Sequence, residues 1–473
     1  MYNNISFFGT HTMIYNTIKH LLLLLITCIV LLYPVPETGS NRNILFLAIL
    51  LLLLIWKFLP QVKHSYFMPP LAEQRYPLLL LFTITAWMFI QTTLFAVDRV
   101  ESFNNLIEEW VIGGLIFGWL TWNLAKITND NAEHSPDGSG LANIGSLLIT
   151  GITLAAFAHA LWLFYHQIPI WQNGGAYPYG STPYAQRDFL SFPINLAFIV
   201  FIADIAGYIS LKKRILRIPL SLSTLFIIIS TAAIIAVHTR NGVLSAVAAL
   251  IILAAATGHY LWYNRQKKMA VMMVAAPLLM INIFAISTIN TDSRWAGFWD
   301  TVEVATDIEN NRAWLDSSKH PYPKTKNGDP VDASAYLRIA WITLTIEGIE
   351  KHPLGYGYGL GAAGKYIEEE YERKGFVSSH SGILDFTLAN GVPGLILWIL
   401  FSAMLLWSGW SVFMKGNPYG LLLILMLANF FTRTVLDGHF GGFRFKMFAL
   451  FMGAIFYLAT HYHYSSKKYA NTD

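Results

Sequence analysis

SSHSGILDFTLANGVPG (378–394) closes a polar segment and leads directly into an apolar run, so it marks a seam in the chain. The polar segment extends from about residue 290 to 380 and holds ten of the 32 Lys/Arg and fourteen of the 28 Asp/Glu. Nine apolar runs precede it and three follow. We therefore predict a membrane protein with one large polar segment, and we expect its chemistry to lie in that segment.

The composition indicates that lipid is the solvent for most of the chain. Only 13% of the residues are charged and the mean hydropathy is +0.46, whereas soluble domains are roughly a quarter charged. The single cysteine, Cys28, excludes a disulfide framework and a thiolate metal site. The formal charge of +4 is too small to indicate a nucleic-acid partner. The first apolar run has no small-residue cleavage site after it, so we expect a retained helix.

The expected fold is an all-α polytopic membrane protein with about twelve transmembrane helices. A helix needs about 20 apolar residues to cross the hydrocarbon core. The runs that meet this criterion lie near 17–34, 43–59, 77–96, 109–126, 142–165, 190–211, 218–237, 242–263, 269–288, 393–413, 418–436 and 445–462. Three regions follow: spans one to nine in residues 1–288, a mainly helical catalytic loop in 289–392, and spans ten to twelve with a tail in 393–473.

The basic residues predict how these spans are oriented. The amino terminus, the loops after even-numbered spans and the carboxyl tail together carry fifteen Lys/Arg, against seven in the short loops on the other side. By the positive-inside rule both termini are cytoplasmic and the catalytic loop is on the outside. Six of the seven outer residues are arginine, which binds phosphate in a bidentate manner. Headgroup anchoring explains any one of them, but together they favour an anionic substrate. The seven are Arg42, Arg99, Arg187, Arg240, Arg433, Arg444 and Lys446.

Two arginines have unusual positions. Arg240 lies in a very short outer turn, where Asn241-Gly242 would let the backbone turn tightly and present the guanidinium to a cavity. The alternative is that Arg240 lies at a helix end and extends its side chain to the membrane surface. Arg338 lies in a predicted helix that ends at Pro353, on the same stripe as apolar residues. An arginine there needs a buried partner, which is either a structural salt bridge or an anionic ligand.

His380 follows two capping serines and opens a predicted helix that closes at Asn390-Gly391, before Pro393 starts span ten. The positive end of a helix dipole favours neutral imidazole, which is the form that a general base needs near pH 7. A packing role is the alternative for a lone histidine. Asp204, within span six near its cytoplasmic half, indicates either a proton or ion path or a structural pair, and we favour the pair.

Three stretches in order resemble the O-antigen ligase/polymerase family of bacterial envelope glycosyltransferases. They are TRNGVLSAVAALI from residue 239, a helix that ends in HPLGYGYG (352–359), and SHSGILDFTLANGVPGLILWIL from residue 379. The resemblance covers roughly residues 225–440. Asn241 stands where a glycine usually follows the arginine, and Ser381 stands where an asparagine usually follows the histidine.

The resemblance implies an inverting, metal-independent glycosyl transfer without a cofactor, at the periplasmic face of the inner membrane. The donor would be a glycan on undecaprenyl diphosphate, and in a ligase the acceptor is a sugar hydroxyl of lipid A-core. By position, Arg240 and Arg338 would hold the diphosphate and His380 would take the acceptor proton. Asp437 would orient the histidine. We add Arg433 and Arg99 to the substrate-binding set because both are outer arginines, and we expect these groups to share a pocket beneath the polar segment.

Two other classes of function stay open at this point. A relative of the ligase would act on another acceptor, as an O-oligosaccharyltransferase for pilin or protein or as the O-antigen polymerase. A non-enzymatic flippase for lipid-linked oligosaccharides would show charges throughout the membrane core or two related halves, and the sequence shows neither.

Overall fold

The computed structural model describes residues 3–57, 72–130, 145–175, 181–183, 185–291, 298–326, 328–359, 361–373, 375, 378–438 and 440–470. Within these ranges the protein is helical, and its only β-type pairing is an isolated bridge between Lys324 and Pro330. The long helices are α1 (Asn3–Leu32), α2 (Gly39–Lys57), α3 (Ala72–Leu94), α6 (Gly145–Gln172), α7 (Arg187–Leu211), α8 (Leu220–Ala236), α9 (Arg240–Tyr263), α10 (Lys267–Thr291), α14 (Gly382–Met414), α15 (Pro418–Leu436) and α16 (Gly442–Ala470).

Shorter helices complete the chain. On the amino-terminal side they are the 3-10 turn η1 (Pro36–Thr38), α4 (Arg99–Asn105), the π-helix η3 (Leu106–Ile116) and α5 (Phe117–Asp130). In the polar segment they are α11 (Phe298–Thr306), the 3-10 turn η6 (Arg312–Trp314), α12 (Ala333–Lys351) and α13 (Ala362–Tyr371). We call residues 298–390 the cap; it comprises α11 to α13 and the first part of α14.

All twelve predicted spans fall on helices, but not all of these helices are long and apolar enough to cross a membrane. Eight of the described helices meet both conditions: α3, α6, α7, α9, α10, α14, α15 and α16. The apolar parts of α1, α2 and α8 are shorter, and the fourth predicted span falls on η3 and α5. The polytopic helical fold is therefore confirmed, whereas the count of twelve stays a prediction.

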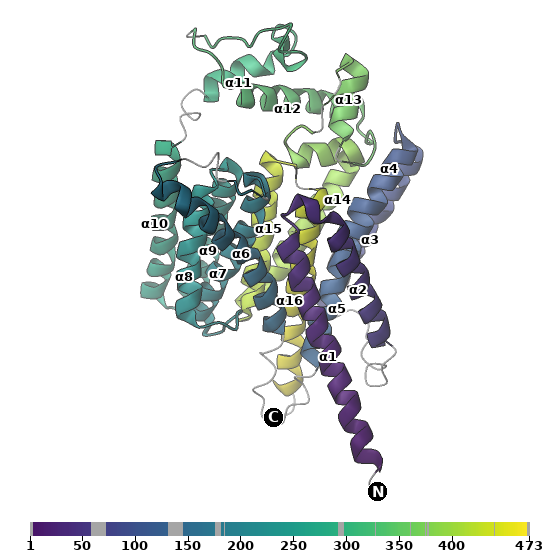
Figure 1. Ribbon diagram of the computed structural model, residues 1–473, viewed down its shortest axis with the longest axis vertical. Coiled ribbons are helices and arrows are strands. Elements are labelled where there is room, and N and C mark those ends of the chain that lie inside the picture. The colour runs from purple at the N-terminus through teal and green to yellow at the C-terminus, as the bar shows by residue number, and fades with distance from the viewer. Residues whose placement is uncertain are drawn as a thin grey trace.

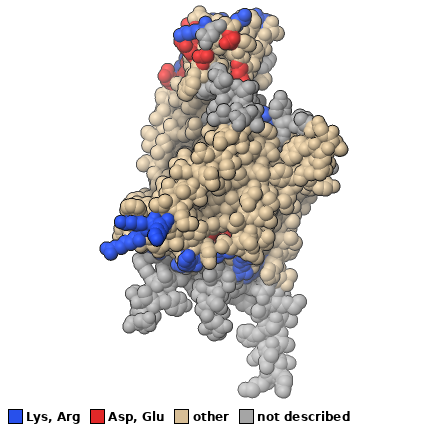
Figure 2. Space-filling view, turned by 90° about the vertical axis from the view of Figure 1, so that its left-hand side faces the viewer, with Lys and Arg blue, Asp and Glu red and all other residues tan. Residues whose placement is uncertain are grey.

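The long helices run side by side and the cap lies across one end of them (Figure 1). The start of α1 and the end of α16 lie at the opposite end. Figure 2 shows, on one face, a belt of mostly uncharged residues between two charged ends: acidic and basic residues mix on the cap, and Lys and Arg gather at the far end. The surface of the bundle is rich in exposed aliphatic and aromatic side chains, as expected of helices that face lipid.

The central helices have hardly any exposed surface. In the most apolar stretches of α7 and α15, 89% and 83% of the residues are buried, against 22% for α10 and 28% for α3. Helices α7, α9 and α15 pack against one another, and α14 packs against α15 and α3. Because the cap-side ends of α7, α9 and α15 meet near the bundle axis, residues at those ends are held close together.

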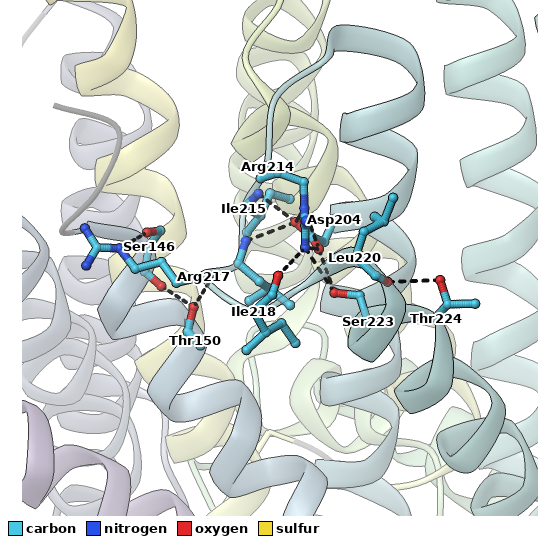
Figure 3. A network of polar contacts seen from close by, with 11 residues as sticks. Ser146, Thr150, Asp204, Arg214, Ile215, Arg217, Ile218, Leu220, Ser223 and Thr224 are labelled. Atoms are coloured by element: carbon cyan, nitrogen blue, oxygen red, sulfur yellow. Dashed lines mark hydrogen bonds and ion pairs between the residues drawn. The ribbon is translucent and has the colours of Figure 1, made fainter. Parts of the chain in front are cut away.

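Asp204 in α7 is the most deeply buried carboxylate of the bundle, and it is fully paired (Figure 3). Its oxygens accept hydrogen bonds from Arg214, whose Nη2 lies 2.6 Å from Oδ2, and from the hydroxyl of Ser223 at 2.9 Å. The backbone N–H groups of Ile215 and Leu216 donate to Oδ1. The predicted structural pair is confirmed: this carboxylate folds the loop between α7 and α8 back into the bundle.

Candidate functional site

The turn that presents His380 is held by short-range hydrogen bonds. His380 has a left-handed backbone (φ 59°), and its N–H donates to the hydroxyl of Ser378 at 3.3 Å. The hydroxyl of Ser379 accepts from the N–H of Ser381 at 3.0 Å, and Oδ1 of Asp385 accepts from the N–H of Ser379 at 3.0 Å. The helix begins at Gly382 with Ser381 as its N-cap, so His380 does not open the helix as predicted; it immediately precedes the cap.

The helix after His380 is broken where the sequence predicts. Gly391 has φ 74° and ψ 172°, so the helix stops at Asn390 and resumes at Val392. A Cβ on Gly391 would lie 2.4 Å from the carbonyl carbon of Leu354, and the N–H of Val392 donates to the carbonyl of Pro353 at 2.9 Å. The segment after α12 thus fills the break and fixes the direction of the short helix that follows His380.

Arg240 is the first residue of α9, directly after a three-residue turn from α8. The tight turn is made by His238 (φ 53°), with Thr239 as the N-cap, so the prediction that Asn241-Gly242 forms the turn is wrong. Gly242 instead permits close packing: a Cβ there would lie 2.5 Å from Oγ1 of Thr239 and 2.6 Å from Oγ of Ser191. The turn therefore sits tightly against α7.

Arg433 joins three helices, because it lies on α15 and contacts residues of α7 and α9. Its guanidinium donates to the hydroxyl of Ser191 at 3.2 Å and lies 5.3 Å from the ring centre of Phe192. The side chain of Asn241 donates to the carbonyl of Arg433 at 3.3 Å. Arg433 is only 1% exposed. It therefore lies under the surface on which a substrate would bind.

Arg338 projects from α12 in the cap. Asp332 caps this helix by accepting from the N–H of Ala335 at 2.7 Å, and the helix ends at Lys351, as predicted from Pro353. Thr345 on the same stripe is fully buried, but Arg338 is exposed. The structural salt bridge, one of the two alternatives for this residue, does not form: no hydrogen bond or ion pair of Arg338 occurs among the described residues.

Arg338 and His380 are nevertheless part of one charged group. Partial desolvation lowers the pKa of the Arg338 guanidinium, which also interacts electrostatically with Asp437, Asp188, Arg240 and Arg187. Burial lowers the pKa of His380; Arg338 and Arg444 lower it further, while Asp437 and Asp188 raise it. We call the whole set the arginine cluster: Arg187, Asp188, Arg240, Arg338, His380, Arg433, Asp437 and Arg444. The cluster keeps the His380 imidazole neutral near pH 7.

Asp437 joins the end of α15 to the turn of His380. It follows the last residue of the helix in an extended conformation, and its carbonyl accepts from the N–H of Gly382 at 3.1 Å. Its carboxylate lies 3.7 Å from the guanidinium of Arg444, which also donates to the carbonyl of Gly438 at 3.2 Å. The described contact of Asp437 with the histidine turn is therefore made through the backbone, and its carboxylate acts on His380 through charge.

Four members of the site were not predicted. Arg187, Asp188 and Arg444 join the cluster, and the indole of Trp341 stacks on the His380 imidazole with 5.5 Å between ring centres and 20° between planes. Arg187 and Arg444 stood among the outer basic residues, but nothing in the sequence places their loops together. Trp341 lies one turn after Arg338 on the same face of α12, so its closeness to a predicted site residue was the signal that could have found it.

Arg99 does not join the cluster. It is exposed at the start of α4, beside Asp98, whose carboxylate pairs with Lys365 of α13 at 3.0 Å. Lys365 also pairs with Glu101, so α13 is tied to α4. The glycine stretch after α12 lies at the same joint, because a Cβ on Gly357 would meet the hydroxyl of Ser102 at 2.5 Å. A small cleft at this joint is lined by residues that include Asp98, Glu101, Lys365 and Glu369.

The described residues contain no group of three or more His, Cys, Asp or Glu side chains with the spacing of a metal site. What they contain is a helical membrane bundle with a cap, and a cluster of arginines around one histidine where the two meet. These features define a polytopic membrane protein with a cationic site at one end of its helix bundle.

Residues 225–399 match the family model described as O-antigen ligase. The matched region runs from α8 to the middle of α14 and includes Arg240, Arg338 and His380. The match indicates a function of the O-antigen ligase/polymerase type. No curated protein matches the chain.

Proposed function

We propose that this protein transfers a glycan from undecaprenyl diphosphate to a sugar hydroxyl of lipid A-core at the periplasmic face of the inner membrane. The observation that carries the proposal is Arg338: an exposed guanidinium with no ion pair among the described residues, in electrostatic contact with Arg240 and next to a neutral histidine. A cation that the protein leaves unpaired in a polar cluster is available to a phosphate group.

The charges of the cluster suit a diphosphate leaving group. Five arginines against two aspartates leave three positive charges in surplus. A glycan-linked lipid diphosphate carries about two negative charges near pH 7, and the released lipid diphosphate about three. The surplus therefore favours the state in which negative charge has moved onto the leaving group, which is the requirement for electrostatic catalysis. Arginine supplies this charge without a metal ion.

In the proposed reaction the residues have separate roles. Arg240 from the bundle and Arg338 from the cap hold the diphosphate from two sides, and the buried Arg433 supports Arg240 from beneath. The neutral imidazole of His380 takes the proton of the acceptor hydroxyl. The acceptor oxygen then bonds to the anomeric carbon as the bond to the diphosphate oxygen breaks, so the configuration inverts. Asp437 fixes the histidine turn through Gly382 and stabilises the imidazolium that forms.

The proposed orientation places the cap in the periplasm and both termini in the cytoplasm. The Lys/Arg that gather at the end opposite the cap support this arrangement (Figure 2). A lipid-linked donor would then reach the cluster from the outer leaflet, since the cluster lies where the cap meets the bundle. Membrane lipids are the remaining expected partner, and no nucleic acid is expected.

The alternative within the family is a different acceptor. The same arginine cluster would serve an O-oligosaccharyltransferase that glycosylates pilin or another protein, or a polymerase that extends the glycan. The family description favours the ligase. A flippase is disfavoured because the buried charges of the bundle core that we describe are satisfied, as Asp204 shows, and the cluster is confined to one end.

The test is reconstitution of the purified protein in proteoliposomes with a lipid-linked glycan donor. Three parallel reactions receive lipid A-core, pilin or no acceptor, each with and without EDTA. Glycan on lipid A-core, insensitive to EDTA, is the expected result. Glycan on pilin or elongation of the donor alone would identify the other family activities. Movement of donor across the bilayer with no transfer in any reaction would overturn the enzymatic proposal, and activity lost to EDTA and restored by Mg²⁺ would overturn the metal-free mechanism.

A further inference from the structure

His380 has an aromatic partner that the proposed reaction has not used. The ring planes of Trp341 and His380 are 20° apart with 5.5 Å between their centres, which is a stacked pair. The two residues come from different parts of the cap: Trp341 from the middle of α12, and His380 from the turn before α14. Stacked aromatic pairs have a preferred geometry, so the indole face restricts how the imidazole can turn.

Trp341 is itself held in place. The guanidinium carbon of Arg373 lies 5.5 Å from the centre of the indole ring, and Nε of Arg373 donates to the carbonyl of Leu315 at 2.9 Å. Trp341 also lies three residues after Arg338 on the same helix. One helix of the cap therefore brings a cation toward the proposed leaving group and an aromatic face to the proposed base.

The backbone of His380 is fixed independently of this stack. Its left-handed turn is held by Ser378, and the neighbouring residues are held by Ser379 and Asp385. These bonds set where the side chain starts but leave its ring free to rotate. Among the described contacts, the Trp341 stack is the one that acts on the ring itself.

We propose that Trp341 is a positioning residue for the proposed reaction: its indole aligns the His380 imidazole with the acceptor hydroxyl and stabilises the imidazolium that proton transfer creates. The inference rests on the proposed function. A neutral imidazole gains little from the negative face of an indole, whereas an imidazolium is attracted to it. The stack thus favours the protonated product of the base step over its neutral starting state, which is the condition for acceleration.

The stack also opposes other influences on the pKa of His380. Burial and the positive charges of Arg338 and Arg444 lower this pKa, whereas Asp437 and Asp188 raise it. The indole face acts in the same direction as the two aspartates, because it favours the protonated ring. The charged groups that face the imidazole come from the cap and from three bundle helices or their ends: Arg338, Asp188, Asp437 and Arg444, with Arg373 beyond the indole.

The test compares Trp341→Leu, Trp341→Phe and the wild-type protein in the reconstituted transfer assay, with rates measured from pH 5 to 8. Trp341→Leu should lower kcat by roughly 10- to 100-fold, which is typical for a mispositioned catalytic group. It should also move the acidic limb of the kcat/KM profile lower by about half a pH unit, because a cation–π contribution of about 0.5–1 kcal/mol is lost. Trp341→Phe keeps an aromatic face and should fall between the two.

The matched control is Trp299→Leu, which removes an indole that is 79% exposed on α11 and should leave both values unchanged. Thermal unfolding of each variant and its binding of inorganic pyrophosphate separate a positioning role from a structural one, since both should match the wild type. NMR titration of histidine-labelled protein reports the His380 pKa without activity and should show the same downward shift in Trp341→Leu.

The outcomes separate this inference from the proposed function. A Trp341→Leu protein with wild-type kcat, or one that loses kcat while its acidic limb and the His380 titration stay in place, would overturn the positioning role. If Trp341→Leu does not fold, an unshifted limb in Trp341→Phe has the same consequence. Full transfer by His380→Ala would instead remove the proposed base, and with it the reaction on which this inference rests.

Discussion

Arg338→Ala should separate catalysis from stability. The substitution removes a guanidinium that is exposed and makes no hydrogen bond or ion pair among the described residues. No buried partner is left behind, so the free energy of unfolding should change by no more than about 0.5 kcal/mol, as for other exposed sites. The loss of this positive charge removes attraction to Asp437 and Asp188 as well as repulsion from Arg240 and Arg187, so the two effects on stability oppose each other.

The effect on transfer should be large. If Arg338 neutralises charge on the departing diphosphate, its loss should lower kcat by about 10²–10³-fold, or about 2.7–4 kcal/mol, by analogy with donors that stabilise a developing oxyanion. Arg338→Lys keeps the charge but loses the planar pair of donors, so it should recover only part of the rate. Removal of Arg338 should in addition raise the pKa of His380, because the guanidinium lowers that pKa.

The assay is transfer in proteoliposomes beside thermal unfolding in detergent, with Arg214→Ala as the matched control. Arg214 is an arginine of the same chain whose loss would leave Asp204 buried and unpaired, which should lower stability by about 3–5 kcal/mol. Arg338→Ala should show low activity with normal stability, and Arg214→Ala low stability. An Arg338→Ala protein with wild-type turnover, or one as unstable as Arg214→Ala, would refute the reasoning.

Three further results are expected. Activity should decline on the acidic side with a midpoint below about pH 6.5, because burial and Arg338 hold the pKa of His380 under its ordinary value and the base stays neutral down to that pKa. A midpoint above about pH 6.5 in the kcat/KM profile would contradict this. Gly391→Ala should lower the unfolding temperature and the activity together, because its left-handed backbone and the 2.4 Å approach to Leu354 leave no room for a Cβ. An unchanged unfolding temperature would show that the backbone at the break in α14 can adjust to a side chain. Asp204→Asn should destabilise the protein without changing the pH profile of transfer, because it weakens a charged network far from the arginine cluster. A shifted profile would show that Asp204 and the cluster are coupled.

The helical fold follows from the sequence because lipid imposes a simple rule. A segment of about 20 apolar residues must satisfy its own backbone in the bilayer, and the helix is the available solution for an unpaired segment. Local signals also worked at the seam: Pro353 predicted the end of α12, and Asn390-Gly391 predicted the break in α14. It was harder to predict which helices are long enough to span the membrane, because the apolar part of α8 is short and the fourth predicted span divides between η3 and α5.

The sequence predicted individual residues of the site, but it did not predict which other residues would join them. Arg240, Arg338 and His380 each stand out by an unusual local position, and in the structure Arg338 interacts electrostatically with both of the others. Arg187 and Arg444 carry no such local mark, because their place in the cluster depends on how α7 and α16 pack around α15. For the same reason Arg99, which looks like the other outer arginines in sequence, lies at the α4 joint instead.

The pairing of Asp204 has a consequence for how the chain enters the bilayer during synthesis. An aspartate within a lone membrane helix opposes insertion, by up to about 2.5–3.5 kcal/mol at the helix centre, and α7 is made before its partner Arg214 leaves the ribosome. The carboxylate is neutralised only when the following loop arrives and folds inward. We therefore expect α7 to reach its final depth in the bilayer together with the start of α8. The two helices would insert as a pair, although the sequence predicts them as separate spans.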